Sequence, residues 1–189
     1  SVRGREVCRE PGNILREAED LLAKGARELW LLGQNVNSYR AGDFRFYDLL
    51  KSLAALPVRR IRFTSPHPKD WDNRLSDLMA ATPAICNHLH LPLQAGADRI
   101  LKLMNRRHTL AEYLGKATYL KAAAPGVEIS TDIIVGYPTE TESEFEATLR
   151  ALEAVRFSQV YSFKYSPRPG TRAGRLPDDV PRAVKEERL

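Results

Sequence analysis

Residues 28–39 read ELWLLGQNVNSY, an apolar run that ends abruptly in a glycine followed by amide side chains. A strand buried on both faces has such a near-continuous apolar sequence, and in a parallel α/β sheet the loop beyond its carboxyl end is where ligands bind. The same arrangement recurs in LHLPLQAG at 89–96 and in ISTDIIVGYP at 129–138. The sequence therefore predicts a site where the ends of three strands carry polar or glycine-containing loops.

Segments with strand character alternate with amphipathic helices along the chain. Strands are predicted to begin near residues 28, 60, 88, 128 and 159, and their spacing of about thirty residues is the size of a βα unit. Two of the helices between them open with the capping-box sequence Thr-x-x-Glu, at 109–112 and at 141–144. Strict alternation predicts an α/β fold with a parallel sheet and right-handed connections.

The number of strands limits the architecture. Five strands with a helix before the first imply a further strand upstream of Ser1 and about six in total, too few for a closed eight-stranded barrel. No GxGxxG follows a strand, so a dinucleotide-binding fold is disfavoured. We therefore expect an open, partial barrel over residues 1–166. Residues 167–189, rich in proline, arginine and acid, are predicted to be a linker.

Composition is that of a globular domain with a basic surface. Of 189 residues 43% are hydrophobic, and 29 Lys and Arg against 24 Asp and Glu give a formal net charge of +5, which suits a polyanionic partner. No run approaches the roughly 18 apolar residues of a membrane span, and residues 1–6 lack the apolar core of a signal peptide, so we expect a cytoplasmic protein without a membrane partner. Cys8 and Cys86 are far apart and are expected to be ordinary thiols.

Histidines and arginines near the predicted strand ends have alternative interpretations. His88 and His90 lie two apart on a strand, so both face one side; they are either half of a metal site or packed, hydrogen-bonded side chains. His67, between two prolines, is either a substrate contact or part of a structural turn. Arg106 is either solvated or placed to pair with a carboxylate or phosphate.

The glycine and amides of the opening stretch also suit ligand binding. Gly33 permits close approach of the backbone, and the amides of Gln34 and Asn35 can accept from an ammonium group or donate to a carboxylate. A tight turn is the alternative. Ser130 and Asp132 can both point into the barrel, where an unpartnered carboxylate would be costly, and Gly136 follows an apolar strand end that suits a stacked base.

Five stretches taken together resemble one family. They are LLGQNVNSY (31–39), RFTSPHP (62–68), HLPLQAGADRILKLMNR (90–106), DIIVGYPTET (132–141) and YSPRPGT (165–171). In this order they are similar to the radical S-adenosylmethionine methylthiotransferases. GQNVNSY and TSPHP are most similar to the branch that methylthiolates C2 of N6-isopentenyladenosine 37 of tRNA.

The resemblance implies a partial six-stranded (βα) TIM-like barrel and a transferase with two 4Fe-4S clusters. One cluster, held by CxxxCxxC after the first strand, reductively cleaves S-adenosylmethionine so that hydrogen is abstracted from the adenine ring. The other cluster supplies sulfur, and a second S-adenosylmethionine supplies the methyl group. The implied partners are tRNA and a flavodoxin-like or ferredoxin-like electron donor, and the protein is expected to be a monomer.

The sequence departs from the family at the cluster. It contains no CxxxCxxC, and SVRGRE at residues 1–6 aligns with a family motif that follows the last cluster cysteine. Thiolates are the usual ligands of such clusters. We therefore expect a fragment without the first strand, the cluster loop, the amino-terminal domain and the carboxy-terminal TRAM domain. Such a fragment is expected to be inactive by itself and to hold neither a metal nor a catalytic residue of its own.

The resemblance also implies roles for single residues. Gly33, Gln34 and Asn35 are implied to recognise the methionine amino group, and Gln94 and Arg106 to lie near the ribose and carboxylate. Ser130, Asp132 and Gly136 are implied to line the ribose and adenine side. The residues predicted on the tRNA side are Arg3, His67 and Arg168. Two alternatives stay open: a barrel metallohydrolase that uses His67, His88 and His90, and a non-catalytic module that binds RNA by charge alone.

Overall fold

The computed structural model describes residues 7–189 and consists mainly of parallel strands alternating with helices. The parallel strands are β1 (Glu28–Leu31), β4 (Arg60–Phe63), β5 (His88–His90), β6 (Glu128–Val135) and β7 (Gln159–Lys164). The helices are α1 (Pro11–Ala23), α2 (Phe46–Ala54), α3 (Asn73–Ala81), α4 (Asp98–Leu103), α5 (Leu110–Ala123), α6 (Glu142–Val155) and α7 (Arg182–Glu187). Short 3-10 helices are formed by Val36–Ser38, Pro68–Asp70 and Ala173–Arg175.

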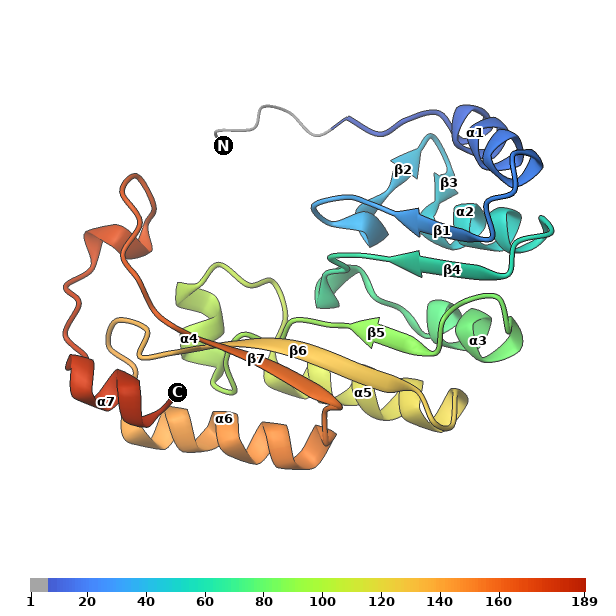
Figure 1. The fold of residues 1–189 in the computed structure, drawn as a ribbon. Helices are drawn as coiled ribbons and strands as arrows, with labels where there is room; N and C mark the ends of the chain where they lie inside the picture. The colour runs from blue at the N-terminus through green and yellow to red at the C-terminus, as the bar shows by residue number, and fades with distance from the viewer. Residues whose placement is uncertain (1–6) are drawn as a thin grey trace.

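The parallel strands follow one another in space in the order of the sequence. β1 pairs with β4, β5 pairs with β6, and β6 pairs with β7, all in parallel. Between β4 and β5 the ladder is reduced to one parallel bridge, Ile61 with Ile85. The strands therefore form an open, partial barrel, as the sequence predicts (Figure 1).

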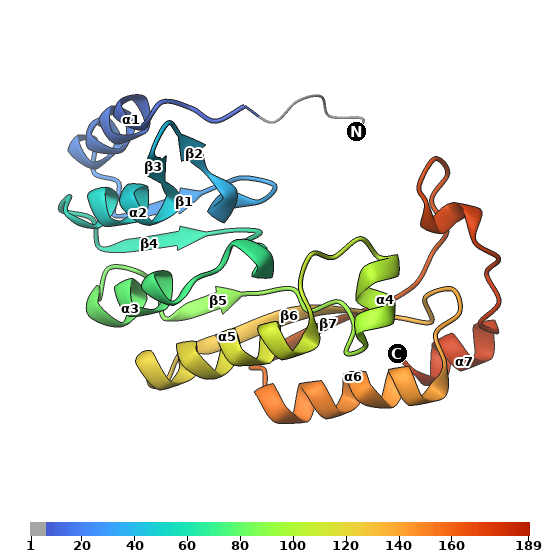
Figure 2. The ribbon, with the colours of Figure 1, turned by 180° about the vertical axis from the view of Figure 1, so that it is seen from behind.

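Helices cover one face of these strands. Figures 1 and 2 show α2, α3, α5 and α6 on the same side, with the opposite face of the strands uncovered. The main core lies under the helices, where alternate strand residues meet them; its fully buried members include Leu50, Leu53, Ile61, Leu89 and Leu120. Burial of such side chains is what holds the helices to the strands.

The five strand starts predicted from the sequence agree with the structure. The predicted capping boxes are also present: the Thr109 and Thr141 side chains accept from the main chain of Glu112 and Glu144, at the starts of α5 and α6. β5 ends at His90, shortly before Pro92, which cannot donate a ladder hydrogen bond. Beyond it Gln94, with φ of 77°, rejoins β6 through a single bridge to Ile133.

Two structured segments were not anticipated from the sequence. Residues 40–45, for which the sequence predicts no strand, contain the antiparallel hairpin of β2 (Arg40–Ala41) and β3 (Phe44–Arg45). Residues 167–189, expected to be a linker, include α7, which Figure 1 shows beside α6. The predicted domain edge near Ser166 stays a prediction. Across residues 7–189 none of the helices combines the length and the apolar character needed to cross a bilayer.

Candidate cofactor site at the strand ends

The uncovered face of the strands carries polar side chains. On β6, Ile129, Ile133 and Val135 are buried against the helices, so Ser130 and Asp132 point to the other side. The register of the sheet aligns Ser130 with His90 of β5 and Asp132 with Tyr161 of β7. The alternation predicted from the sequence therefore assembles a row of polar groups across three strands.

These groups are within hydrogen-bond distance of one another. The Ser130 hydroxyl lies 3.1 Å from His88 Nε2 and 3.0 Å from His90 Nδ1. His90 Nε2 lies 3.3 Å from Asp132 Oδ2, and the Tyr161 ring meets the His90 ring edge-on with centroids 5.9 Å apart. His88 and His90 thus have the packed, hydrogen-bonded arrangement that was one of their two interpretations. Within residues 7–189 no group of three or more His, Cys, Asp or Glu could hold a metal ion.

Arg106 is a largely enclosed cation close to Asp132. Burial lowers the pKa of its guanidinium, and the charge of Asp132 opposes that shift. Among residues 7–189 its guanidinium donates no hydrogen bond and forms no ion pair that satisfies distance criteria. A guanidinium in this condition is ready to take a carboxylate or a phosphate in two parallel hydrogen bonds.

His67 and His108 form a pair beside Arg106. Their ring centroids are 5.7 Å apart, and neither ring nitrogen of the buried His108 has a hydrogen-bond partner in the described part of the chain. Burial, together with the charges of Arg106 and His108, lowers the pKa of His67 to about 4. Both rings are therefore neutral near pH 7.

The end of β1 is joined to this pair through Asn37. Its side-chain oxygen accepts from the His67 main-chain N–H at 2.7 Å, and its nitrogen donates to the His67 carbonyl at 3.0 Å. Nearby, Asn35 Nδ2 donates to Asp70 Oδ2 at 2.9 Å, whereas Asn35 Oδ1 is buried without a partner among residues 7–189. An unpartnered buried carbonyl oxygen suits a donor such as an ammonium group.

These residues form what we call the polar row, from the end of β1 to the face of β6. Asn37 is hydrogen-bonded to His67, and Asp132 lies within hydrogen-bond distance of His90. Between these two pairs, Arg106 affects His67 and Asp132 through its charge, without a hydrogen bond or an ion pair to either among residues 7–189. Sequence reasoning named His67, His90, Arg106 and Asp132 singly and included Asn37 only as the end of the candidate loop 33–37, whereas it gave His108 no role. Asn37 was signalled by its place in the same polar loop, whereas the burial of His108 depends on how α5 packs and has no local signal.

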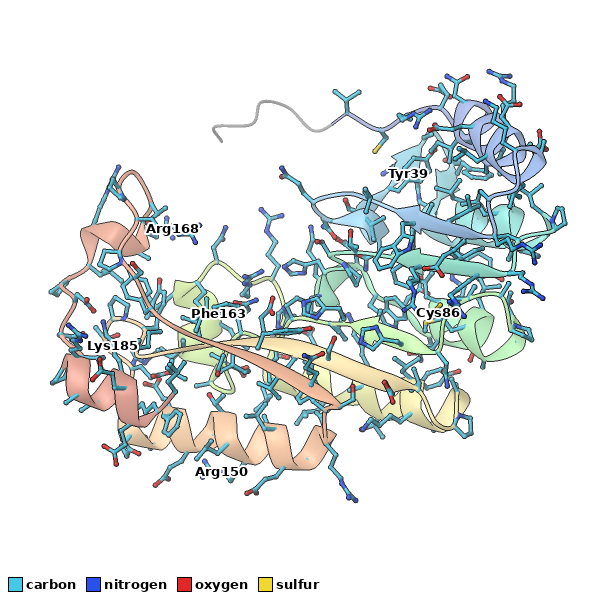
Figure 3. The ribbon with its side chains drawn as sticks, viewed as in Figure 1. Tyr39, Cys86, Arg150, Phe163, Arg168 and Lys185 are labelled. Atoms are coloured by element: carbon cyan, nitrogen blue, oxygen red, sulfur yellow. The ribbon has the colours of Figure 1, made fainter. Side chains whose placement is uncertain are left out.

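The structure places the other predicted residues as follows. Gln94 is buried, and its main chain bonds to β6 on both sides, through Asp132 O at 2.8 Å and Ile134 N at 2.9 Å. Gly136, with φ of 67°, begins the loop after β6. Gly33 and Gln34 are exposed beyond β1. Figure 3 shows Arg168 on the segment after β7, where it is exposed, and Arg3 lies outside the described residues.

A mostly apolar pocket of about 900 Å³ lies between α1 and β1. Its lining includes Leu21, Trp30, Gly33, Gln34 and Asn35. It does not reach Arg106 or Asp132, so it borders the polar row only at the end of β1. Among residues 7–189 β1 pairs with β4 alone, so the pocket lies along the edge of β1 that has no partner in the described part of the chain.

The fold and the polar side chains define a class of protein: a partial (βα) barrel with a candidate ligand site at the carboxyl ends and inner face of its strands. A family model described as the radical SAM superfamily matches residues 1–152. The chain belongs to that superfamily.

Curated relatives resemble the chain over its full length. It is 49% identical to a tRNA-2-methylthio-N(6)-dimethylallyladenosine synthase from Acidithiobacillus ferrooxidans and 53% identical to one from Nitratidesulfovibrio vulgaris. Each alignment covers 100% of this chain and 43% of the relative, so the chain spans less than half the length of these proteins.

Solved structures confirm the fold. The radical S-adenosylmethionine methyltransferase TsrM from Kitasatospora setae superimposes with a TM-score of 0.70 at 19% identity, over 88% of this chain and 33% of that one. Coproporphyrinogen III oxidase from Escherichia coli, described as a radical SAM enzyme, gives 0.68 at 16% identity, over 95% and 44%. At these identities the likeness concerns architecture alone.

Superfamily membership implies S-adenosylmethionine and a 4Fe-4S cluster as cofactors. The chain's two cysteines, Cys8 and Cys86, are free thiols, and the described residues offer no metal-binding group, so they do not fit the cluster. They do fit S-adenosylmethionine, because within residues 7–189 Asn35 Oδ1 has no donor and Arg106 has no paired anion, and because Asp132 and Ser130 can accept from hydroxyl groups.

Proposed function

We propose that this chain is the S-adenosylmethionine-binding barrel of a tRNA methylthiotransferase that acts at C2 of N6-isopentenyladenosine 37. The observation that carries the proposal is about 50% identity, across the whole chain, to synthases named for that product. The unpartnered polar groups at the strand ends support it, because their chemistry suits a ligand with an ammonium, a carboxylate and a ribose.

In this proposal the end of β1 holds the methionine end of the cofactor. Asn35 Oδ1 accepts from the amino group, with Gly33 and Gln34 giving room and further polar contact, and Arg106 pairs with the carboxylate. Gln94 lies near the ribose. Beside a reduced cluster, bound S-adenosylmethionine supplies the species that abstracts hydrogen from the substrate.

The face of β6 holds the nucleoside end. Asp132 and Ser130 accept from the ribose hydroxyls, and His90, bonded to both side chains, keeps them oriented. The main chain at Gly136 lies against the adenine. On the tRNA side we assign Arg3, His67 and Arg168, where His67, neutral because of its low pKa, acts as a hydrogen-bonding contact and not as a charge.

The proposal includes parts that this chain does not supply. A strand from outside residues 1–189 pairs with the unpaired edge of β1, as the adjoining pocket of about 900 Å³ suggests. The cluster thiolates and an electron donor of the flavodoxin or ferredoxin type are also external. The barrel ends near Ser166, residues 167–189 lead toward a TRAM domain, and the protein works as a cytoplasmic monomer. By itself the chain is inactive.

The test is the nucleoside content of tRNA after disruption of the gene that encodes this chain. We expect the 2-methylthio derivative of N6-isopentenyladenosine to disappear from tRNA hydrolysates and the unmodified precursor to accumulate, as measured by mass spectrometry. Loss of a different 2-methylthio nucleoside would reassign the substrate. Unchanged tRNA would contradict the proposal and favour the metallohydrolase or the RNA-binding module.

A further inference from the structure

The loop that connects β6 to α6, residues 136–140, has an unfavourable backbone. Gly136 has φ of 67° and Thr139 has φ of 69°. Glycine adopts the left-handed region freely, but a β-branched residue such as threonine rarely does and keeps this conformation only where surrounding contacts impose it. The contacts around this loop must therefore be strong enough to hold Thr139.

Part of those contacts comes from residues 178–189, which we call the C-terminal clamp. Asp179 Oδ1 accepts the main-chain N–H of Thr139 at 2.7 Å. Arg188 Nη1 donates to Glu140 Oε2 at 2.9 Å, and the same oxygen accepts the N–H of Gly136 at 2.7 Å. Each end of the loop is thus bonded, directly or through Glu140, to the clamp.

A third contact comes from Lys185. Its aliphatic stem occupies the space that a Cβ at Gly136 would need, so no larger residue fits there without displacing the stem. Its ammonium group pairs with Asp178 and lies 5.4 Å from the centre of the Tyr165 ring. Asp178 and Tyr165 thus fix the ammonium end of Lys185, so that its stem stays packed against Gly136. Figure 3 shows Lys185 on α7.

The pair of Arg188 and Glu140 is buried. The Glu140 side chain is 1% exposed and that of Arg188 is 6% exposed. Arg188 also reaches Glu142 at 2.7 Å and lies over the ring of Phe145, which anchors it to the first turns of α6. Removal of one member of such a pair leaves an uncompensated buried charge, so the effect on the neighbouring loop is large.

We propose that the C-terminal clamp is a positioning device for residues 136–140, and that Arg188, acting through Glu140, sets the main chain that faces the adenine end of the cofactor. The inference rests on the proposed function, because it takes the Gly136 loop as part of the S-adenosylmethionine site. It adds that a segment beyond the last strand controls this site without touching the ligand.

The experiment compares Arg188→Ala with a matched control, Arg182→Ala, in the 189-residue chain. Arg182 is the first residue of α7 and Arg188 directly follows the end of that helix, but the ion pair of Arg182 with Glu186 is on the surface. Native-state hydrogen exchange should show the amides of Gly136 and Thr139 exchanging at least about tenfold faster in Arg188→Ala, with little change in β6 and no change in Arg182→Ala. Arg188→Lys, which keeps the charge, should restore part of the protection.

A second variant keeps the test decisive if Arg188→Ala does not fold. Asp179 is exposed, so Asp179→Ala should fold and should speed exchange at Thr139 in particular. Binding of S-adenosylmethionine, measured by calorimetry, should weaken about tenfold in the clamp variants and remain unchanged in Arg182→Ala.

The outcomes separate the clamp from the proposed function. Unchanged exchange at residues 136–140 in both clamp variants would overturn the clamp. Faster amide exchange at residues 136–140 with unchanged affinity for S-adenosylmethionine would show that the clamp holds the loop but does not affect cofactor binding, and would overturn that part of the proposal. Failure of the wild-type chain to bind S-adenosylmethionine would contradict the proposed function and that link together, while the exchange rates would still decide whether the clamp holds the loop.

Discussion

Gly96 illustrates how one residue sets the distance between a strand end and a helix. A Cβ on Gly96 would lie 2.5 Å from the carbonyl oxygen of Ala147 and 2.5 Å from the Cα of Thr148, both in the backbone of α6. The Gly96 N–H also donates to the Thr148 hydroxyl at 2.8 Å. The loop after β5 can pack this closely only because the side chain is a hydrogen atom.

We therefore expect Gly96→Ala to destabilise the fold by about 2 kcal/mol or more, because helix backbone cannot move aside as a flexible side chain can. The control is Gly115→Ala. Gly115 lies within α5 with nothing near its missing Cβ, so alanine should stabilise the protein by about 1 kcal/mol through helix propensity. Urea unfolding measures both, and equal effects of the two substitutions would contradict the packing.

His67 makes stability depend on pH. Its pKa in the folded chain is about 4, against 6.5 for an ordinary histidine, because burial and the nearby Arg106 and His108 disfavour its charge. The unfolded chain then binds a proton that the folded chain does not between these two values, so stability falls as the pH drops through this window.

Between about pH 7 and pH 5 this residue should cost the fold about 1 to 2 kcal/mol, and His67→Gln should remove that part of the slope. Urea unfolding of both proteins at the two pH values measures the difference. The comparison stays above pH 5 because acidic groups such as Glu144, with a pKa of about 2, lose their contribution only at lower pH. An identical slope in the variant would show that His67 does not carry it.

At the scale of elements, the start of α6 tests a feature predicted from sequence. The Thr141 side chain accepts from the Glu144 N–H, and the Glu144 carboxylate accepts from the Thr141 N–H at 2.9 Å. Thr141→Ala should destabilise the chain by about 1 kcal/mol. Thr118→Ala, an exposed position within α5, is the matched control and should be neutral or slightly stabilising. Thermal unfolding distinguishes them, and equal midpoints would argue against the cap.

The sequence was sufficient for elements whose signal is local. Apolar runs predicted the starts of the five parallel strands, and the capping-box sequences predicted the starts of α5 and α6. The β2–β3 hairpin was missed because each of its strands has two residues, too short for an alternating pattern. Helix α7 was missed because it is short and polar, and its order comes from contacts such as Arg188 with Glu140 that link residues 48 positions apart.

In the candidate site too, the sequence predicted only the residues whose position depends on a local pattern. Asn35 could be named because it lies in the loop beyond β1, and Asp132 because strand alternation turns it to the same face as Ser130. His108 and the clamp residues could not, since their burial results from the packing of α5 and α7. The assignments of Gly33, Gln94 and Arg168 to particular cofactor or tRNA atoms stay predictions.

At the scale of the whole molecule, helices on one side leave a polar face on the other. The uncovered face carries His88, His90, Ser130 and Asp132, which lie within hydrogen-bond distance of one another, and Arg106 and the pair of Asn37 and His67 continue the polar row toward the end of β1. An open barrel of this kind leaves its polar face accessible to a ligand as large as a nucleoside with an amino-acid tail. The central claim is that this face binds S-adenosylmethionine.

Titration of S-adenosylmethionine into the ¹⁵N-labelled chain, followed through the backbone amide resonances, tests that claim most directly. The account predicts shifts at residues 33–35, at Arg106 and at residues 130–136, with the outer helix α3 unaffected. The absence of shifts at a saturating concentration, or shifts confined to the helical face, would contradict it.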